Sequence, residues 1–292
     1  MSQKGSIQVD GAILHYAIEG TGIPILVIGS ATYYPRTFSR HLRECCTLAF
    51  ADVRHFAESD VALSVDRITF DTYANEMDAI RGRLGFEQVV VVGHSHHGNL
   101  ALEYAKRYPD RASHVVLIGS PPFGVKRTVE VSDDYWAAYA SEDRKAALRH
   151  NWDAVSVDKR AVLSPSDAFI AQYVADGPKY WYDVTYDASW LWHGMQVNME
   201  LVSRFRGLFD EYELSWDPTR VKAPVLVMMG RHDYVVPPVL WEEVLPKLKN
   251  VTYHVFERSG HTPQLEEPEM FDQVLLEWLR KGSAADGVLL ND

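Results

Sequence analysis

Residues 89–100 read VVVVGHSHHGNL, and this stretch decides the fold of the chain. The valines Val89–Val92 predict a strand that is buried on both faces, as strands in parallel sheets are. Residues 100–108 carry apolar side chains at helical spacing and precede Pro109, so they predict a helix. A Gly-x-Ser turn between such a strand and such a helix holds Ser95 at a strained corner, with its hydroxyl exposed above a helix N-terminus. The stretch by itself fits a nucleophile and also fits an ordinary strand-to-helix turn.

Composition limits the classes of protein that this chain can represent. Of the 292 residues, 47% are hydrophobic, which is enough to bury a large core. The formal charge of −11 argues against a nucleic-acid partner, because neutralising phosphates needs a basic surface. No stretch approaches the roughly 18 apolar residues of a membrane helix, and no signal peptide is visible, so we expect no membrane partner. The only cysteines, Cys45 and Cys46, are adjacent and favour packing in a reducing compartment, so we expect a cytoplasmic protein.

Strand and helix patterns alternate along most of the chain. Two short strands within residues 7–16 flank Asp10-Gly11, which is a strong hairpin signal. Six further strands are predicted at residues 23–28, 47–51, 89–92, 115–119, 224–230 and 251–256. Helices are predicted at residues 70–84, 100–108 and 268–280. Strands that are joined through helices form a mostly parallel sheet. The predicted fold class is therefore α/β, with a mostly parallel eight-stranded sheet flanked by helices.

The alternation stops after the sixth strand. Residues 123–216 show helical periodicity, many aromatic side chains and no convincing strand. We therefore predict a helical cap at 123–216, inserted into a core domain formed by residues 1–122 and 217–282. Residues 283–292 are predicted to form a flexible tail.

Two further segments supply partners for the serine. A serine hydroxyl needs a base to take its proton, and the base needs a third group to orient it. Asp233 follows the seventh strand in Gly-Arg-His-Asp, and His261 follows the eighth strand in Ser-Gly-His-Thr-Pro. Taken singly, Asp233 fits a turn cap and His261 fits a surface or core histidine. Because the carboxyl ends of parallel strands meet at one edge, the order Ser95, Asp233, His261 predicts a catalytic triad.

With these motifs, the chain resembles the α/β-hydrolase superfamily over nearly its full length. The resemblance rests on the elbow at Ser95 and the segments at Asp233 and His261, supported by residues 52–59 and 119–122. Within the superfamily, the chain is most similar to the capped, proline-iminopeptidase-like and esterase branch. The position of the elbow implies an oxyanion hole made by two backbone N–H groups, those of Ser30 and His96.

The chain departs from the usual motifs of the superfamily at several positions. His97 stands where the elbow has its second glycine, and Gly98 follows it. Ile28 replaces the histidine that usually precedes Gly29 in the oxyanion loop, and His55 replaces a usual glycine. Iminopeptidases proper carry a glycine-rich oxyanion loop and a tryptophan after the serine, and this chain has neither.

Other residues could contact a ligand. His94, His96 and His97 invite a metal site, but their side chains should diverge around the elbow, so we expect no metal. Among the cap aromatics, we expect Trp190 and Trp192 to face an apolar pocket. Glu200 lies in the cap, where iminopeptidase-like enzymes use acidic residues to hold an amino group, and a solvated helix face explains it equally well. These three residues are the predicted substrate contacts.

The sequence thus predicts a serine hydrolase that needs no cofactor. It would cleave a small ester, lactone or amide with an apolar or aromatic part, through an acyl-enzyme. One alternative is a proline-iminopeptidase-like aminopeptidase. An alternative of another class is a ligand receptor or signalling protein that turns over slowly on the same fold. We expect a small-molecule substrate and a monomer or homodimer.

Overall fold

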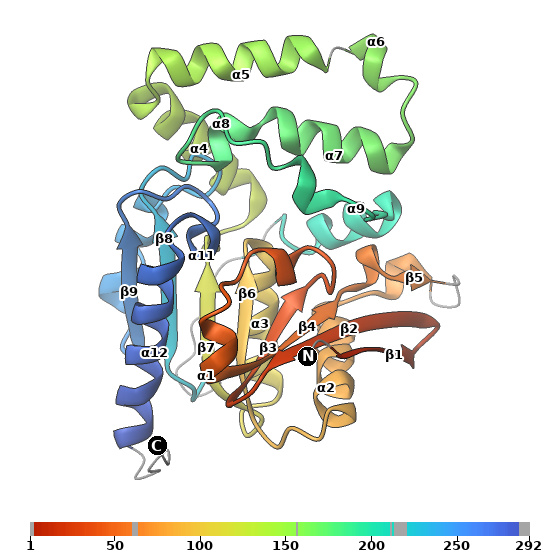
Figure 1. Ribbon diagram of the computed structural model, residues 1–292, viewed down its shortest axis with the longest axis vertical. Helices are drawn as coiled ribbons and strands as arrows, with labels where there is room; N and C mark the ends of the chain where they lie inside the picture. The colour runs from red at the N-terminus through yellow and green to blue at the C-terminus, as the bar shows by residue number, and fades with distance from the viewer. Residues whose placement is uncertain (1–2, 60–63, 156, 211, 213–220, 286–292) are drawn as a thin grey trace.

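The centre of the molecule is one sheet, which all the predicted strands join. The computed structural model describes residues 3–59, 64–155, 157–210, 212 and 221–285. The strands follow the order β1-β2-β4-β3-β6-β7-β8-β9 across the sheet (Figure 1). Their bounds are β1 (Gln3–Val9), β2 (Ala12–Gly20), β3 (Ile23–Gly29), β4 (Cys46–Asp52), β6 (Val89–His94), β7 (Ala112–Ile118), β8 (Val225–Gly230) and β9 (Val251–Phe256). The prediction of eight strands is confirmed, and a two-residue strand β5 (Glu58–Ser59) also pairs with β2.

The strand directions bring several strand ends to one edge. β1, β2 and β4 are antiparallel neighbours, whereas the pairs from β4 across to β9 are parallel. The first hairpin turns at Asp10 and Gly11, whose φ angles of 44° and 78° suit the tight turn that Asp-Gly predicts. β6 lies between β3 and β7, and all six of its residues are buried. Because β6 is an inner strand, the residues that follow it lie near the middle of the edge formed by the carboxyl ends of the parallel strands.

Helices cover both faces of the sheet. α2 (Phe70–Arg83) and α3 (His96–Arg107) contribute to the hydrophobic cluster on one face. α1 (Leu42–Cys45) and α12 (Pro268–Ala285) pack on the other face, where α12 contributes Phe271, Leu275, Leu276 and Leu279. The short elements near the strand ends are α10 (Val239–Glu242), α11 (Pro263–Glu266), η1 (Tyr34–Arg36), η2 (Arg54–Phe56), η3 (Val65–Arg67) and η5 (Leu245–Lys247). Within the described residues, no helix combines the length and apolar character that a membrane crossing requires.

A set of helices is inserted between β7 and β8. They are α4 (Val125–Tyr139), α5 (Glu142–Ala154), α6 (Val157–Arg160), α7 (Pro165–Ala175), α8 (Gly177–Tyr180), η4 (Ser189–Trp192) and α9 (Met199–Gly207). In Figure 1 these inserted helices lie over the upper end of the sheet. Residues 213–216, at the predicted cap boundary, lie outside the described residues, so the domain division stays a prediction. α12 includes residues 283–285 of the predicted tail, and residues 286–292 are not described.

The turn from β6 into α3 depends on close packing of Gly98. A Cβ atom on Gly98 would collide with the Ser120 side chain, which follows β7. His97 therefore occupies the usual glycine position while Gly98 permits the close approach of helix and strand. The close packing that the second glycine of the elbow usually permits is therefore provided one residue later, by Gly98.

Gly98→Ala should destabilise the protein by about 1–3 kcal/mol, because the added methyl group overpacks a buried contact. The matched control is Gly82→Ala on α2, where an added Cβ meets nothing within 4 Å. Gly82→Ala should leave stability unchanged or raise it by up to about 1 kcal/mol through helix propensity. Urea unfolding of both variants measures the difference, and equal stabilities would contradict the packing argument.

Candidate active site

Ser95 lies at a strained turn directly after β6. Its φ and ψ angles are 56° and −137°, and Asp10 is the other described non-glycine residue with positive φ. The Ser95 amide donates to the carbonyl of Ile118 at 2.8 Å, which fixes the turn to the end of β7. The side chain is partly exposed at the start of α3. Strain of this kind persists only where surrounding structure imposes it, and it is characteristic of a nucleophile elbow.

His261 and Asp233 form a buried pair. The His261 Nδ1 atom lies 2.6 Å from Asp233 Oδ2, and the two residues are 3% and 0% exposed. The other carboxylate oxygen of Asp233 accepts hydrogen bonds from the Val235 and Val236 amides at 2.9 and 2.7 Å. Both carboxylate oxygens of Asp233 are thus fixed by hydrogen bonds. Asp233 Oδ2 holds the His261 imidazole through its Nδ1 atom rather than through Nε2.

The three predicted triad residues lie at one edge of the sheet. Among the described residues, the hydrogen bond between Asp233 and His261 is present, and the one between His261 and Ser95 is not. His94, which precedes Ser95, lies 2.8 Å through its Nε2 atom from the carbonyl oxygen of His261. The rings of His94 and His261 have centroids 4.5 Å apart. Within the described part of the chain, no hydrogen bond joins Ser95 Oγ to the His261 ring. The Asp–His contact is therefore present, and the role of Ser95 stays a prediction.

The predicted oxyanion residues lie on two adjoining segments. Ser30 follows β3, and its hydroxyl oxygen accepts hydrogen bonds from the Thr32 and Tyr33 amides, each at 3.1 Å. The intervening Ala31 amide donates to Asp52 Oδ1 at 2.6 Å. Burial raises the pKa of Asp52 to about 6, although this hydrogen bond lowers it.

His96, the other predicted oxyanion residue, is the first residue of α3. Amides in the first turn of a helix have no partner within the helix. The His96 ring stacks on Phe209, with centroids 4.7 Å apart. Burial lowers the pKa of His96 to about 4.

The three elbow histidines have different partners. His94 Nδ1 lies 3.2 Å from the Tyr34 hydroxyl, and His97 Nδ1 lies 3.0 Å from the same hydroxyl. His97 also stacks on His55 with centroids 5.6 Å apart, whereas His96 contacts Phe209. No group of three or more metal-ligating side chains occurs among the residues that the structure describes.

A run of aromatic rings from the inserted helices begins at His261. The Tyr180 ring lies 5.4 Å from the His261 ring and 5.3 Å from Tyr173. Trp192, a predicted substrate contact, is partly buried. Its ring lies 5.3 Å from the Tyr173 ring and 5.0 Å from the ring of Tyr33, in the loop after β3. The arrangement gives this side of the site an aromatic character.

The other two predicted substrate contacts are more exposed. Trp190 is 39% exposed and donates its indole N–H to the Tyr186 hydroxyl at 3.0 Å. Glu200 is exposed in the first turn of α9. The structure does not bring either side chain into contact with Ser95 or His261, and their substrate role stays a prediction.

The inserted helices are hydrogen-bonded directly to the His261 loop. The His261 amide donates to the carbonyl of Tyr180 at 2.6 Å. The Glu266 carboxylate accepts from the amides of Tyr182, Gly260 and Thr262 at 2.6, 2.9 and 3.2 Å. Burial raises the pKa of Glu266 to about 7, against the lowering effect of these amides. Glu266 was not predicted from the sequence, because its partners are main-chain amides, which every residue except proline carries.

Two arginines that the sequence does not single out hold the same insertion through hydrogen bonds to its carbonyl groups. Arg144 is 6% exposed and donates to the carbonyls of Pro178, Trp181 and Tyr182, each at 2.7 Å. Arg36, in η1, donates to the carbonyls of Trp190, Leu191 and His193 at 3.2, 2.6 and 2.8 Å. No sequence signal identifies such partners, because every residue has a carbonyl.

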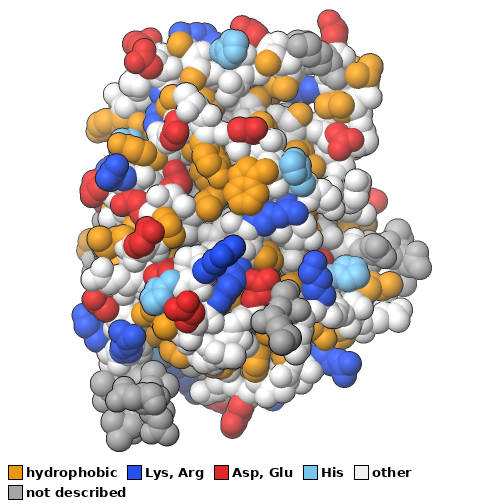
Figure 2. Space-filling model, viewed as in Figure 1, with side chains coloured by type: hydrophobic (Ala, Val, Ile, Leu, Met, Phe, Trp, Pro, Cys, Tyr) orange, Lys and Arg blue, Asp and Glu red, His pale blue; other side chains and the backbone are white. Residues whose placement is uncertain are grey.

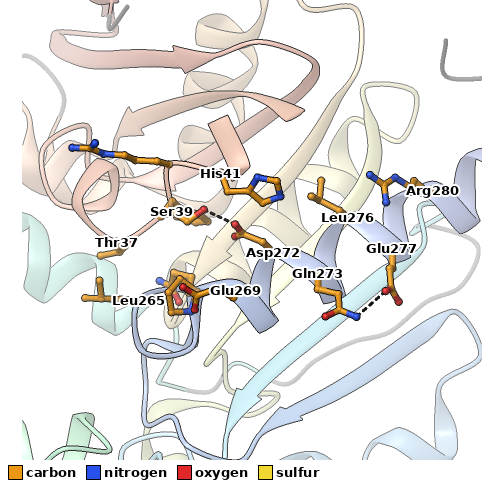
Figure 3. A pocket seen from close by; sticks show the side chains of 14 residues that line it. Thr37, Ser39, His41, Leu265, Glu269, Asp272, Gln273, Leu276, Glu277 and Arg280 are labelled. Atoms are coloured by element: carbon orange, nitrogen blue, oxygen red, sulfur yellow. Dashed lines mark hydrogen bonds between the residues drawn. The ribbon is translucent and has the colours of Figure 1, made fainter. Parts of the chain in front are cut away.

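A groove of about 660 Å³ lies between residues 37–41 and α12 (Figure 3). It contains residue types of a triad, namely Ser39, His41 and Asp272. Figure 3 shows Ser39 bonded directly to Asp272, while His41 Nδ1 pairs with Glu44 at 3.3 Å. No imidazole lies between hydroxyl and carboxylate here, so the groove lacks a nucleophile–base pair.

Known proteins with similar sequences identify the family of this chain. A family model described as alpha/beta hydrolase fold matches residues 22–268. The AB hydrolase superfamily protein YclE of Bacillus subtilis (strain 168) is 35% identical over 281 residues, which cover 96% of this chain and 99% of that protein. The proline iminopeptidase of Clostridioides difficile (strain 630) is 26% identical, over 72% of each chain.

Solved structures give the same fold. The crystal structure of a proline iminopeptidase from Mycobacterium smegmatis matches with a TM-score of 0.70 and 18% identity, over 97% of this chain and 100% of that one. A thermophilic esterase from Thermogutta terrifontis matches with a TM-score of 0.67 and 22% identity, over 96% and 99%. The chain belongs to the alpha/beta hydrolase fold family and is a hydrolase of that superfamily.

Proposed function

We propose that this protein is a serine hydrolase that cleaves a small ester, lactone or amide through an acyl-enzyme. The observation that carries the proposal is the strained backbone of Ser95, with φ of 56°, beside the buried His261–Asp233 pair. A non-glycine residue pays about 1–3 kcal/mol for such a conformation, and this strain clusters at functional sites.

The proposed chemistry follows the acyl-enzyme route. Ser95 Oγ attacks the carbonyl carbon of the substrate while His261 Nε2 takes the hydroxyl proton. Asp233 keeps the imidazole oriented through Nδ1 and stabilises the imidazolium. His261 then gives the proton to the leaving group as its bond to the carbonyl carbon breaks. In the second half, His261 Nε2 takes a proton from a water molecule whose oxygen attacks the acyl carbon, and returns that proton to Ser95 Oγ as the acyl group leaves as a carboxylic acid.

The backbone N–H groups of Ser30 and His96 are the proposed oxyanion hole. Ala31, the other candidate on the loop after β3, already donates its amide to Asp52, which supports Ser30 as the donor. His96 follows the nucleophile and starts α3, so its amide has no helical acceptor. Each such donor contributes about 3 kcal/mol to transition-state stabilisation.

The surroundings of the site support a substrate with an apolar or aromatic part. Tyr180, Tyr173, Trp192 and Tyr33 form a run of ring contacts that begins at His261. Acidic and basic side chains are interspersed on the face shown in Figure 2, and the net charge is −11. The aromatic rings beside His261 and the absence of a basic face among the described residues in Figure 2 both support a small-molecule substrate.

The free thiols of Cys45 and Cys46 support a reducing, cytoplasmic location.

A fluorophosphonate probe should label the purified protein with about one adduct per chain. Ser95→Ala and His261→Ala should abolish labelling, because one lacks the nucleophile and the other the base. Ser95→Ala should also lower kcat for short p-nitrophenyl esters by at least about 10⁴-fold. Ser39→Ala and His41→Ala are matched controls from the groove and should label like the wild type, as measured by intact-protein mass spectrometry.

Each alternative function has its own outcome in these assays. Labelling that persists in Ser95→Ala would show that Ser95 is not the nucleophile. A folded wild type that takes up no probe would favour a slow-turnover receptor, which the absent hydrogen bond between Ser95 Oγ and His261 among the described residues also fits. Cleavage of aminoacyl amides with a free amino group, but not of N-blocked analogues, would identify an aminopeptidase.

The buried carboxyl of Asp52 should make stability depend on pH. Its pKa of about 6 in the folded protein exceeds the unfolded value of about 4, so the unfolded chain ionises first as the pH rises. The contribution of Asp52 to the free energy of unfolding is present below about pH 4 and is lost by about pH 6. Asp52→Asn should therefore reduce the stability lost between pH 4 and 7 by about 2–3 kcal/mol.

Urea unfolding across this pH range measures the effect. Asp134→Asn, at an exposed position on α4, is the matched control and should follow the wild-type profile. Parallel profiles for Asp52→Asn and wild type would contradict the assignment of this pH dependence to Asp52.

A further inference from the structure

A carbonyl group determines the tautomer of His94. The Nε2 atom of His94 lies 2.8 Å from the carbonyl oxygen of His261, and a carbonyl oxygen only accepts hydrogen bonds. Nε2 of His94 therefore carries a hydrogen. Burial, together with the neighbouring His261, holds the pKa of His94 well below its usual value, so the ring is neutral. A neutral imidazole carries one hydrogen, which leaves Nδ1 of His94 as an acceptor.

The remaining hydrogen-bond directions follow from this anchor. The Tyr34 hydroxyl, 3.2 Å from His94 Nδ1, must donate its only hydrogen there. Its oxygen then serves as the acceptor for His97 Nδ1, which lies 3.0 Å away and so carries the hydrogen of the neutral His97 ring. His97 Nε2 is left as a bare acceptor, and it is buried with no partner among the described residues.

Tyr34 connects this chain to the oxyanion loop. Its amide donates to the carbonyl of Ser30 at 3.3 Å, and its side chain is buried. Gly29 has φ of 147°, and a Cβ atom there would collide with the Tyr34 ring and lie 3.0 Å from His97 Nδ1. The loop, the ring of Tyr34 and the elbow are thus packed together without spare space.

We propose that Tyr34 is a positioning residue. It fixes the relative positions of three segments: the proposed oxyanion loop after β3, the turn at Ser95 and the loop that carries His261. It acts through one directional chain, in which His97 donates to Tyr34, Tyr34 to His94, and His94 to the carbonyl of His261. This inference rests on the proposed function of Ser95. It also gives His97 a role at the position where the family usually has glycine.

The expected size of the effect follows from how precisely the oxyanion donors must be placed. Donors act only when they lie about 2.7–3.1 Å from the developing oxyanion, and a shift of about 1 Å costs on the order of 100-fold in rate. Hydrogen bonds in a buried chain also polarise one another, so the loss of the middle member weakens both neighbours.

Tyr34→Phe should lower kcat for the best ester substrate about 10- to 100-fold and leave KM within about twofold. The reason is that the oxyanion donors act on the transition state rather than on bound substrate. Tyr104→Phe is the matched control. Tyr104 is also fully buried, and its hydroxyl donates to Asp78 at 3.0 Å, on the helix pair α2–α3. Its loss costs a comparable hydrogen bond and should leave both constants unchanged.

Substitutions at His97 test the direction of the chain. His97→Asn keeps an N–H donor close to the Nδ1 position, and it should retain more activity than His97→Ala, which has none. A purely structural role would make the activity of these variants follow their stability, which urea unfolding measures separately.

Nitrogen-15 NMR of the histidine rings tests the chain without reference to activity. The wild type should show His94 with its hydrogen on Nε2 and His97 with its hydrogen on Nδ1. In Tyr34→Phe, the resonances of both Nδ1 atoms should shift. The opposite tautomers, or wild-type kcat in Tyr34→Phe alongside a labelled Ser95, would overturn the proposal. If the wild type takes up no probe at Ser95, the proposed function fails and the positioning role fails with it, while the NMR result still decides the hydrogen-bond chain.

Discussion

The chain reversal at Ser95 is the constraint on which the rest of the site depends. An L-residue avoids positive φ, so the surroundings must offset the strain. β6 is buried between two parallel neighbours, the Ser95 amide is bonded to Ile118, and Gly98 lets α3 pack against Ser120. The loop after β3, which carries the proposed oxyanion donor Ser30, and the loop of His261 lie around a turn that the sheet fixes.

The sequence predicts the features that follow from periodicity and strand order. The valines of β6 give a buried strand, and Asp10-Gly11 gives the first hairpin, because both signals are local. Asp233 and His261 could be paired in advance, because the ends of parallel strands share an edge and the two residues follow neighbouring strands. Their 2.6 Å contact agrees with that expectation, whereas the role of Ser95 awaits the labelling experiment.

The features that could not be predicted from the sequence depend on partners that are far apart in the chain. These partners are mostly main-chain groups, which no residue type identifies. Arg36 and Arg144 donate to main-chain carbonyls, and Glu266 accepts from main-chain amides. Tyr34 is hydrogen-bonded to histidines about sixty positions away, and only the packing of the loop after β3 on the turn at Ser95 brings these residues together. The strand β5 is too short, at Glu58–Ser59, to show any alternation.

The hydrogen bond between the His261 amide and the Tyr180 carbonyl has a consequence for protein engineering. The inserted helices cannot be exchanged as an independent module, because their main chain is a structural partner of the proposed catalytic base. A chimaera must offer a carbonyl in the place of Tyr180 and an amide in the place of Tyr182. A graft that lacks them would leave His261 and Glu266 without these partners, even with Ser95, Asp233 and His261 unchanged. Compatibility between an insertion and its sheet therefore depends here on backbone geometry as well as on side-chain contacts, such as those of Ser132 and Arg204 with the core.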